Sequence, residues 1–334
     1  MMMWNGGMLC LDRRSLLSLP FLLLPNGRAF SQSENYPDRT VTIVFPYTSG
    51  GLIDALARIV ATKLQQRFNK SFVVENRPGG ASVVGTLSVV RSVPDGYTIL
   101  LASTAIASNV NMLKIQPYDP IKDLVPIALI ARIPQVLIVN AELPVRSLPE
   151  LVEFARSKPG GLTFASAGVG TSPHLCGEML KLELKINLTH LPYRGNFPAI
   201  QDVAGGHADL MFSDILNAIP LAQTGKIHMI GVSVSQRVQI IPDIPSLAEL
   251  GVPGFDLAGL FLFAVPIKTP KAIINILHTA IRETANDSTV RHEFSRRGAI
   301  PIDSPTENEL VGFLQSEIAR WGEIIRKTGL AGSL

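Results

Sequence analysis

The sequence predicts a mixed α/β fold of two lobes, between which the chain passes twice. From residue 40 to residue 102, three β-branched apolar runs alternate with two stretches of helical apolar spacing. This is the βαβαβ order of a mostly parallel sheet. The same alternation begins again after Pro134 and continues to about residue 233. We therefore assign residues 32–132 and 258–334 to lobe 1, and residues 133–257 to lobe 2.

The expected strands of lobe 1 are rich in Val, Ile, Thr, Phe and Tyr, the residue types that favour strands. They cover residues 40–45, 72–74 and 97–102. Between them, apolar residues recur at helical spacing over residues 53–64, and a second helical stretch runs over residues 82–93.

Lobe 2 is expected to repeat this order. Its strands are residues 162–166, 188–191, 210–212 and 229–233, and its helical stretches are residues 173–182, 198–204 and 215–223. Strands that alternate with helices in this way are typical of parallel α/β units.

Two helices are predicted to close the chain. Thr269-Pro270 provides the first with an N-cap followed by proline at the first helical position. Ser304-Pro305-Thr306-Glu307 provides the second with a capping box. We expect both helices to pack on lobe 1, which requires crossings near residues 130–134 and 256–261. Two crossings between lobes form a hinge.

The first 31 residues have the order of an export signal. Arg13-Arg14 is basic, residues 16–24 are largely apolar, and Ala29-Phe30-Ser31 carries the small residues that a signal peptidase reads. We therefore expect export to the periplasm with cleavage near Ser31. A twin-arginine route is only partly matched. The alternative is an untidy N-terminus that results from a wrong start codon.

Charge, hydropathy and cysteine content exclude several classes of protein. The formal net charge is +3, and removing residues 1–31 takes away three arginines and one aspartate, which leaves the mature chain at about +1. This argues against a nucleic-acid binder, which carries a strong basic patch. The best later apolar run, residues 257–265, is far too short to span a membrane. Cys176 is then the single cysteine, so no internal disulfide is possible.

Glycines and small hydroxyl residues directly follow several of the predicted strands. The stretches are residues 45–51, 75–82, 165–172 and 191–195. A strand that turns through glycine into a helix presents unpaired backbone N–H groups, and the helix dipole adds positive potential there. Such turns can hold an anion without a lysine or arginine for each negative charge. The candidate ligand-binding residues are Tyr47, Thr48, Ser49, Gly50, Gly51, Asp54, Gly79, Gly80, Ala81, Ser82, Ser103, Ser166, Gly170, Thr171, His174, Arg194 and Asp214.

Four of these side chains have a second interpretation that the sequence leaves open. Asp54 orients a polar ligand group or only pairs with Arg58 at i,i+4. His174 contacts the ligand or, as is commoner for a lone histidine, packs or caps a helix. Arg194 pairs with a distal carboxylate or is a solvated surface residue. Asp214 binds an amine or caps the next helix.

Motifs for catalysis, metal binding and dinucleotide binding are not matched. The sequence has neither a G-x-S-x-G nucleophile elbow nor an H-E-x-x-H motif. The G-x-G-x-x-G pattern fails after Gly170, where His174 stands near the position of the next glycine. We expect no cofactor, no metal and no catalysis, although a triad of Ser166 or Ser213 with His174 stays open.

A series of motifs along the mature chain carries a family resemblance. They are Phe45-Pro46 with Gly50-Gly51 and Asp54, Arg58, Val74-Glu75-Asn76-Arg77-Pro78-Gly79, Pro94-Asp95-Gly96-Tyr97-Thr98, Gly168-Val169-Gly170-Thr171 with His174-Leu175, Pro192-Tyr193-Arg194-Gly195, Pro242-Asp243-Ile244-Pro245 with Glu249, Gly251 and Pro253-Gly254-Phe255, and Glu317-Ile318-Ala319-Arg320-Trp321. With these motifs the chain resembles the Bug family of extracytoplasmic solute receptors, the substrate-binding subunits of tripartite tricarboxylate transporters.

This resemblance implies a periplasmic, two-lobed Venus-flytrap fold of the type II binding-protein kind. In that family a ligand carboxylate typically rests on backbone amides of the first two strand–helix loops, often with ordered waters. Those loops correspond here to residues 48–54 and 78–82. The second lobe covers the far end of the ligand, through residues 166–174, residues 193–195 and the end of the Phe212 strand.

Three positions depart from the family pattern, and they bear mainly on the distal ligand contacts. Ala81-Ser82-Val83 replaces the usual Gly-Gly-Asn, Arg194 stands where lysine is common, and Ser213 precedes Asp214 where aspartate often follows phenylalanine directly.

The resemblance implies a monomeric receptor that binds a small carboxylate and delivers it to membrane permease subunits, without nucleic acid and without membrane insertion. An exported enzyme that uses the same cleft, or a ligand-binding partner of a sensor kinase, is the alternative. Whether the ligand is a dicarboxylate, a tricarboxylate, an aromatic acid or an amino acid stays open.

Overall fold

One long strand, β4 (Leu124–Asn140), joins two halves of a β-sheet in the computed structural model, which describes residues 1–3 and 35–334. Residues Pro37–Leu334 form one compact unit. Up to Pro134, β4 pairs with β9 (Ala258–Pro266), and from Gln135 onward it pairs with β7 (Leu210–Asp214). We call these two sides the first and the second sheet half.

The first sheet half has the strand order β2-β1-β3-β9-β4. Strand β1 (Val41–Phe45) pairs in parallel with β2 (Phe72–Asn76) and with β3 (Thr98–Ala102). Strand β9 runs antiparallel to β3 and β4, and the short β10 (Ile300–Pro301) runs antiparallel to β4. The three strands expected here are confirmed to within two residues at each end.

The second sheet half continues in the order β4-β7-β5-β6, and β8 (Ile227–Val232) also pairs with β4. Strand β5 (Leu162–Ser166) is parallel to β6 (Leu188–Pro192) and to β7. The expectation of a mostly parallel sheet is wrong for the centre, because β4 and β9 run antiparallel to their neighbours. The parallel pairs lie in the outer strands of each half.

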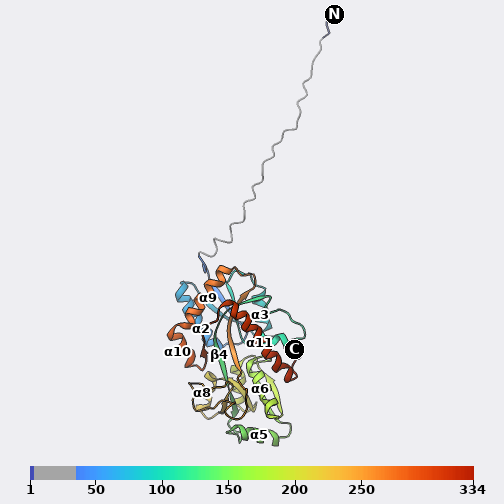
Figure 1. The fold of residues 1–334 in the computed structure, drawn as a ribbon, viewed down its shortest axis with the longest axis vertical. Helices are drawn as coiled ribbons and strands as arrows, with labels where there is room; N and C mark the ends of the chain where they lie inside the picture. Colours follow the sequence, from blue (N-terminus) through green and yellow to red (C-terminus); the bar gives the residue numbers. More distant parts are fainter. Residues whose placement is uncertain (4–34) are drawn as a thin grey trace. The chain divides into compact units, whose positions relative to one another are not determined.

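Helices follow most strands and cover the faces of the sheet. In the described residues they are α2 (Leu52–Phe68), α3 (Val83–Val90), α4 (Ala105–Met112), α5 (Leu148–Ser157), α6 (Ser172–Leu184), α7 (Asn196–Ala204), α8 (Ile215–Gln223), α9 (Lys271–Asn286), α10 (Ser288–Ser295) and α11 (Glu307–Lys327). In Figure 1, α2, α3 and α9 lie at one end of the unit and α5, α6 and α8 at the other, with β4 running between them.

Helix α2 shows how the sequence places a helix start near the end of β1. Leu52, Leu56, Val60 and Leu64 recur at helical spacing and are at most 1% exposed. Burial of each such side chain contributes about 1.5–3 kcal/mol. Helix α2 ends at Asn69, which adopts the left-handed conformation (φ 50°) typical of a C-cap.

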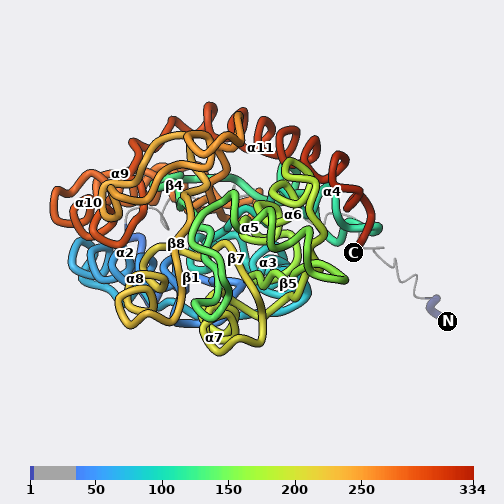
Figure 2. The backbone as a smooth tube through the Cα atoms, turned by 90° about the horizontal axis from the view of Figure 1, so that it is seen from below, coloured from blue at the N-terminus to red at the C-terminus, as the bar shows by residue number. Residues whose placement is uncertain are grey.

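The two closing helices pack against elements of the first sheet half. Helix α9 contacts α2 and β4, whereas α11 contacts α4 and β4 and also reaches α6, as Figure 2 shows along its length. The N-cap of α9 is Pro270, one residue later than expected. The capping box of α11 joins Thr306 and Glu309, and the Thr306 N–H donates to Glu309 Oε2 at 2.8 Å. The box expected at residues 304–307 is therefore shifted by two residues.

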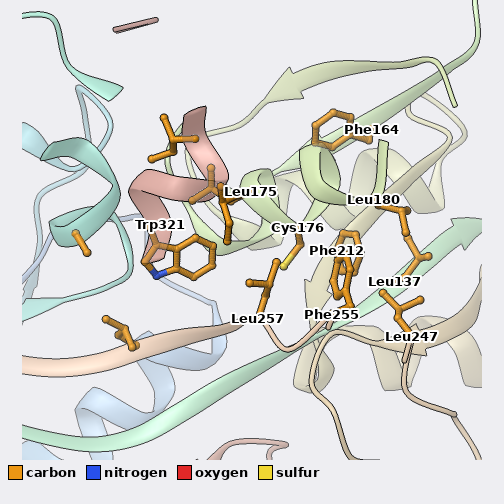
Figure 3. Packing of buried hydrophobic residues seen from close by; sticks show 14 of the residues in the cluster. Leu137, Phe164, Leu175, Cys176, Leu180, Phe212, Leu247, Phe255, Leu257 and Trp321 are labelled. Carbon is orange, nitrogen blue, oxygen red and sulfur yellow. The ribbon is translucent and has the colours of Figure 1, made fainter. Parts of the chain in front are cut away.

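The core cluster of Figure 3 ties α11 to the second sheet half. Trp321 of α11 is fully buried beside Leu175 and Cys176 of α6, near Leu257. Its indole N–H donates to Glu317 Oε2 at 2.9 Å, which satisfies the single polar group of the ring. Burial also raises the pKa of the Cys176 thiol, which behaves as a core residue.

The export signal expected at residues 1–31 lies outside the described residues apart from its first three. Within the part of the chain that the structure describes, no helix has both the length and the apolar character that a bilayer crossing requires.

Candidate functional site

A cavity lies where loops of the two sheet halves meet, and we call it the central cavity. It contains about 570 Å³ of space free of protein atoms, part of it open to solvent. Its lining residues are Phe45, Tyr47, Thr48, Gly51, Leu52, Ile53, Ser103, Thr104, Ile133, Gln135, Ala167, Thr171, Ser172, Pro173, Gly195, Asn196, Asp214 and Gly259.

Asp214 joins the N-termini of two helices at the central cavity. Gly51, the N-cap of α2, has no side-chain cap of its own, and the Leu52 N–H donates to Asp214 Oδ2 at 3.3 Å. Asp214 Oδ1 accepts from the Asn217 N–H at 3.0 Å and so caps α8. Burial, only partly offset by these backbone bonds, raises the pKa of Asp214 to about 6. The interpretation of Asp214 as a helix cap is confirmed.

Hydroxyl groups line the part of the central cavity that the first sheet half forms. Tyr47 Oη and Ser103 Oγ lie 2.9 Å apart. Burial raises the pKa of Tyr47 to about 12, so the phenol is neutral near pH 7. Thr104 is 1% exposed, and its hydroxyl has no hydrogen-bond partner among the described residues. A hydroxyl can rotate to donate to a bound oxyanion.

The central cavity has an unusual charge balance for an anion site. Among the described residues that line it, Asp214 is the only charged one. An acidic group bound here would therefore be held by hydroxyl and backbone N–H donors. Each hydrogen bond to a charged group contributes about 1.5–3 kcal/mol, and a helix N-terminus up to about 2 kcal/mol.

A second cavity adjoins the central one and shares Tyr47 and Ala167 with it. The turn at residues 79–82 and Arg194 line this second cavity. Gly80, Ala81 and Ser82 adopt φ angles of 54°, 52° and 73°, a left-handed conformation that costs non-glycine residues about 1–2 kcal/mol each. The structure thus places the two predicted glycine turns on neighbouring cavities rather than on one.

Asp54 lines neither cavity. Its carboxylate accepts from the Gly50 N–H, from the Arg58 guanidinium and from Asn76 Nδ2, at distances of 3.1–3.3 Å. Asn76 Nδ2 also donates to the Tyr47 carbonyl at 3.0 Å. The predicted pairing with Arg58 is confirmed, and Asp54 holds the loop after β1 in place.

His174 and Ser166 lie in a buried ring cluster that lines neither cavity. His174 Nδ1 accepts from the Gly170 N–H at 3.2 Å, and the His174 and His190 ring centroids are 3.9 Å apart. Burial lowers the pKa of His174 to about 3 and that of His190 to about 4. Ser166 Oγ pairs with His190 Nε2 at 2.6 Å, not with His174. Ser166 is 0% exposed, so this pair does not reach a substrate.

Loops of the two sheet halves bond directly beside the central cavity. Thr48 Oγ1 donates to the Arg194 carbonyl at 2.9 Å, and Ser108 Oγ donates to the Gly170 carbonyl at 2.6 Å. Gly195 has a φ of 154°, and a Cβ atom there would lie 2.2 Å from Thr48 Oγ1. Only glycine allows this approach without a shift of the loops.

The sequence analysis missed several lining residues, among them Thr104, Gln135 and Asn196. Six predicted residues line neither cavity: Ser49, Gly50, Asp54, Ser166, Gly170 and His174. Gln135 is 3% exposed and is a polar interruption of the apolar strand β4, a signal that could have identified it. Asn196 begins α7 directly after the Gly195 turn. Ser49 and Gly50 are exposed and line neither cavity.

Metal binding has no support in the described residues. They contain no group of three or more His, Cys, Asp or Glu side chains arranged to hold an ion.

Comparisons with known proteins identify the family. A model described as "Tripartite tricarboxylate transporter family receptor" matches residues 56–330. Over 299 residues the chain is 31% identical to Protein BugT of Bordetella pertussis, which covers 89% of this chain and 91% of that protein.

Two solved structures are similar in fold and sequence. One is Rpa4515 of R. palustris with adipate, at a TM-score of 0.85 and 32% identity, covering 89% of this chain and 99% of that one. The other is the periplasmic binding protein BugD, at a TM-score of 0.84 and 30% identity, covering 89% of this chain and 99% of that one. The expected periplasmic-binding-protein class of α/β fold is thereby confirmed. Because the family model spans most of the chain and the similarity extends over nearly all of each relative, the chain belongs to the tripartite tricarboxylate transporter receptor family, as its motifs predicted.

Proposed function

We propose that this protein is a periplasmic receptor that binds a small carboxylate in the central cavity and delivers it to the permease subunits of a tripartite transporter. The observation that carries the proposal is a cavity lined from both sheet halves by neutral hydrogen-bond donors, in a chain of this receptor family. The adipate bound to the R. palustris relative supports a carboxylate as the ligand class.

The donors proposed for the carboxylate are the Thr104 hydroxyl, the one proton that the Tyr47–Ser103 hydroxyl pair leaves over, and the backbone N–H groups at the start of α2. Removing a carboxylate from water costs several kcal/mol. Four or five charge-assisted bonds at about 1.5–3 kcal/mol each exceed that cost. A micromolar dissociation constant requires about 8 kcal/mol net, which this number of donors can supply.

The second cavity is proposed to receive the far end of a longer ligand. It begins at Tyr47, which both cavities share, and includes the turn at residues 79–82 and Arg194. The side chain of Arg194 has no ion-pair partner among the residues of the described part of the chain. A guanidinium of this kind can accept a carboxylate in bidentate fashion.

The receptor is proposed to act by hinge closure without covalent chemistry. Lobe 1 would comprise residues 32–132 and 258–334, and lobe 2 residues 133–257, in a monomer released by cleavage after Ser31. A ligand that touches both lobes favours the closed arrangement. The bond between Thr48 and the Arg194 carbonyl joins the two sides and would then report closure.

Calorimetry on the mature protein purified from the periplasm tests the proposal. Titration with a panel of dicarboxylates, tricarboxylates and aromatic acids should show saturable heat for at least one class, and the ligand should be recovered unchanged. Ser103→Ala should weaken binding about tenfold through the loss of one donor. Ser316→Ala, an exposed site on α11, is the matched control and should bind normally. Absence of heat with every acid, or conversion of the ligand to product, would contradict the proposal.

A further inference from the structure

One residue that lines the central cavity, Asn196, has a buried hydrogen-bond acceptor that no described residue satisfies. Asn196 Nδ2 donates to Ser213 Oγ at 3.0 Å, and that hydroxyl in turn donates to the Asp214 carbonyl at 3.1 Å. This chain of bonds fixes the Asn196 amide, because Ser213 Oγ must accept from the NH₂ group. Asn196 Oδ1 is left buried with no partner among the described residues. A buried acceptor without a donor is destabilising unless a bound molecule supplies one.

Asp214 adds a carboxylate to the same wall. It is 5% exposed, and its described partners are neutral: two backbone N–H groups at 3.0 and 3.3 Å and Asn217 Nδ2 at 3.4 Å. An ionised carboxylate has about four acceptor positions. No lysine, arginine or histidine is among the described residues that line the central cavity. The negative charge of Asp214 therefore has no cationic counterpart there.

A ligand with acidic groups alone would worsen this imbalance, because it would place a second negative charge beside the buried carboxylate of Asp214. A protonated amino group would correct it. An ammonium carries three N–H donors and a positive charge. Its N–H groups could bond Asn196 Oδ1 and the remaining acceptor positions of Asp214, and its charge would balance that of the carboxylate. The Thr104 hydroxyl and the one proton that the Tyr47–Ser103 pair leaves over remain available for the acid group of the same molecule.

We propose that the ligand is a small zwitterion, a carboxylate that also carries a protonated amino group, and that Asp214 and Asn196 Oδ1 accept the N–H bonds of that group. This inference rests on the proposed function, since it names the class of carboxylate that the receptor takes. The competing interpretation is that Asp214 serves only as the cap of α8 and the partner of the Leu52 N–H.

Pairs of ligands that differ by one amino group separate the two interpretations. The mature protein is titrated with aspartate and succinate, glutamate and glutarate, and 2-aminoadipate and adipate. The zwitterion proposal expects the amino member of at least one pair to bind tenfold or more tightly than its partner. In Asp214→Asn this preference should fall at least tenfold, because the substitution removes the charge but keeps the shape of the side chain.

Two further variants make the test independent of any folding defect. Asn196→Ala removes the unpaired acceptor together with the bond from its Nδ2 to Ser213 Oγ, and it should reduce the amino preference. Asp209→Asn makes the same chemical change at a residue outside both cavities, where the carboxylate bonds Thr163 and Lys158. This control should leave the preference intact.

The outcomes distinguish this inference from the function on which it rests. If the des-amino acids bind as tightly as the amino acids, or more tightly, the zwitterion is refuted and the carboxylate receptor stands. If the preference exists but survives Asp214→Asn, the assignment of the amine to Asp214 is refuted. If neither member of any pair binds but another acid of the panel does, the zwitterion is refuted and the carboxylate receptor stands. If no acid of the panel binds, both the proposed function and this inference fail.

Discussion

Asp214→Asn should stabilise the folded protein above pH 6 and change its stability little at pH 4. The pKa of Asp214 is raised from 3.8 to about 6, chiefly by burial. Well below pH 3.8 the carboxyl is protonated in both the folded and the unfolded chain, so it affects their balance little. As the pH rises from 4 to 6, the unfolded chain releases its proton first, and the free energy of unfolding falls. Above pH 6 the loss is complete.

The size of this effect follows from the pKa shift. Each pKa unit corresponds to 1.36 kcal/mol, so the shift of Asp214 amounts to about 3 kcal/mol at pH 7. Asparagine has no charge to bury, and its side-chain oxygen can still accept from the Asn217 N–H. Its amide nitrogen, which replaces Oδ2, cannot accept from the Leu52 N–H, and the loss of that bond costs about 1–2 kcal/mol. We therefore expect a net gain of about 1–2 kcal/mol at pH 7.

Urea unfolding of the ligand-free protein between pH 4 and pH 8 measures this difference. Asp209→Asn is the control, and its effect on the free energy of unfolding should have the opposite sign. Burial alone would raise the pKa of Asp209, but bonds from the Thr163 N–H and from Lys158 outweigh it and lower the pKa. Its replacement should therefore cost stability at neutral pH and little in acid. The reasoning would be refuted if the difference in the free energy of unfolding between Asp214→Asn and the wild type stayed constant across this pH range or grew larger in acid.

Three further substitutions have defined expectations. Gly195→Ala should weaken carboxylate binding tenfold or more by calorimetry, because the new Cβ would lie 2.2 Å from Thr48 Oγ1. Gly160→Ala, at a glycine of positive φ with open space around it, is the control and should leave binding unchanged. Equal losses of affinity in both variants would contradict the role given to Gly195. Tyr47→Phe should cost about 1 kcal/mol of binding free energy through one lost hydroxyl, and unchanged affinity would remove Tyr47 from the site. Trp321→Ala should lower the free energy of unfolding by about 3–5 kcal/mol in urea; a loss below 1 kcal/mol would show that α11 is not held by this ring.

The alternation of strands and helices made most of the fold predictable. Strands β1, β2, β3, β5, β6, β7 and β8 were all expected near their observed ends, because each contains a short apolar run. Glycine turns after β1, β2, β5 and β6 marked the ends of those four strands. Strand β4 was missed since it contains Pro126 and Pro134, and proline within a run argues against a strand. Strand β9 was noted only as an apolar run at residues 257–265. Their antiparallel pairing joins residues more than 100 positions apart, which no local pattern encodes.

The candidate site was predictable in its loops and less so in its side chains. Tyr47, Thr48, Gly51, Ser103, Thr171 and Asp214 line the central cavity as residues of predicted strand ends. Asp54, Ser166 and His174 stand at similar loop positions, but their side chains bond protein groups instead. The direction of a side chain depends on packing against elements that are distant in the sequence. The ring of His174, on α6, lies with its centroid 3.9 Å from that of His190, which belongs to β6. Loop position alone therefore cannot separate a residue that faces the cavity from one that supports it.

The continuity of β4 constrains how the two sheet halves can move. Its backbone passes from pairing with β9 to pairing with β7 between Pro134 and Gln135, with no loop between them. The returning chain is tied at the same level, where the Leu257 N–H donates to the Ser233 carbonyl at 2.7 Å. In the proposed hinge closure, these two adjacent connections would allow rotation of one sheet half about a single axis and oppose sliding of one half past the other. Ligands of different length would then change the extent of the proposed closure and not its direction.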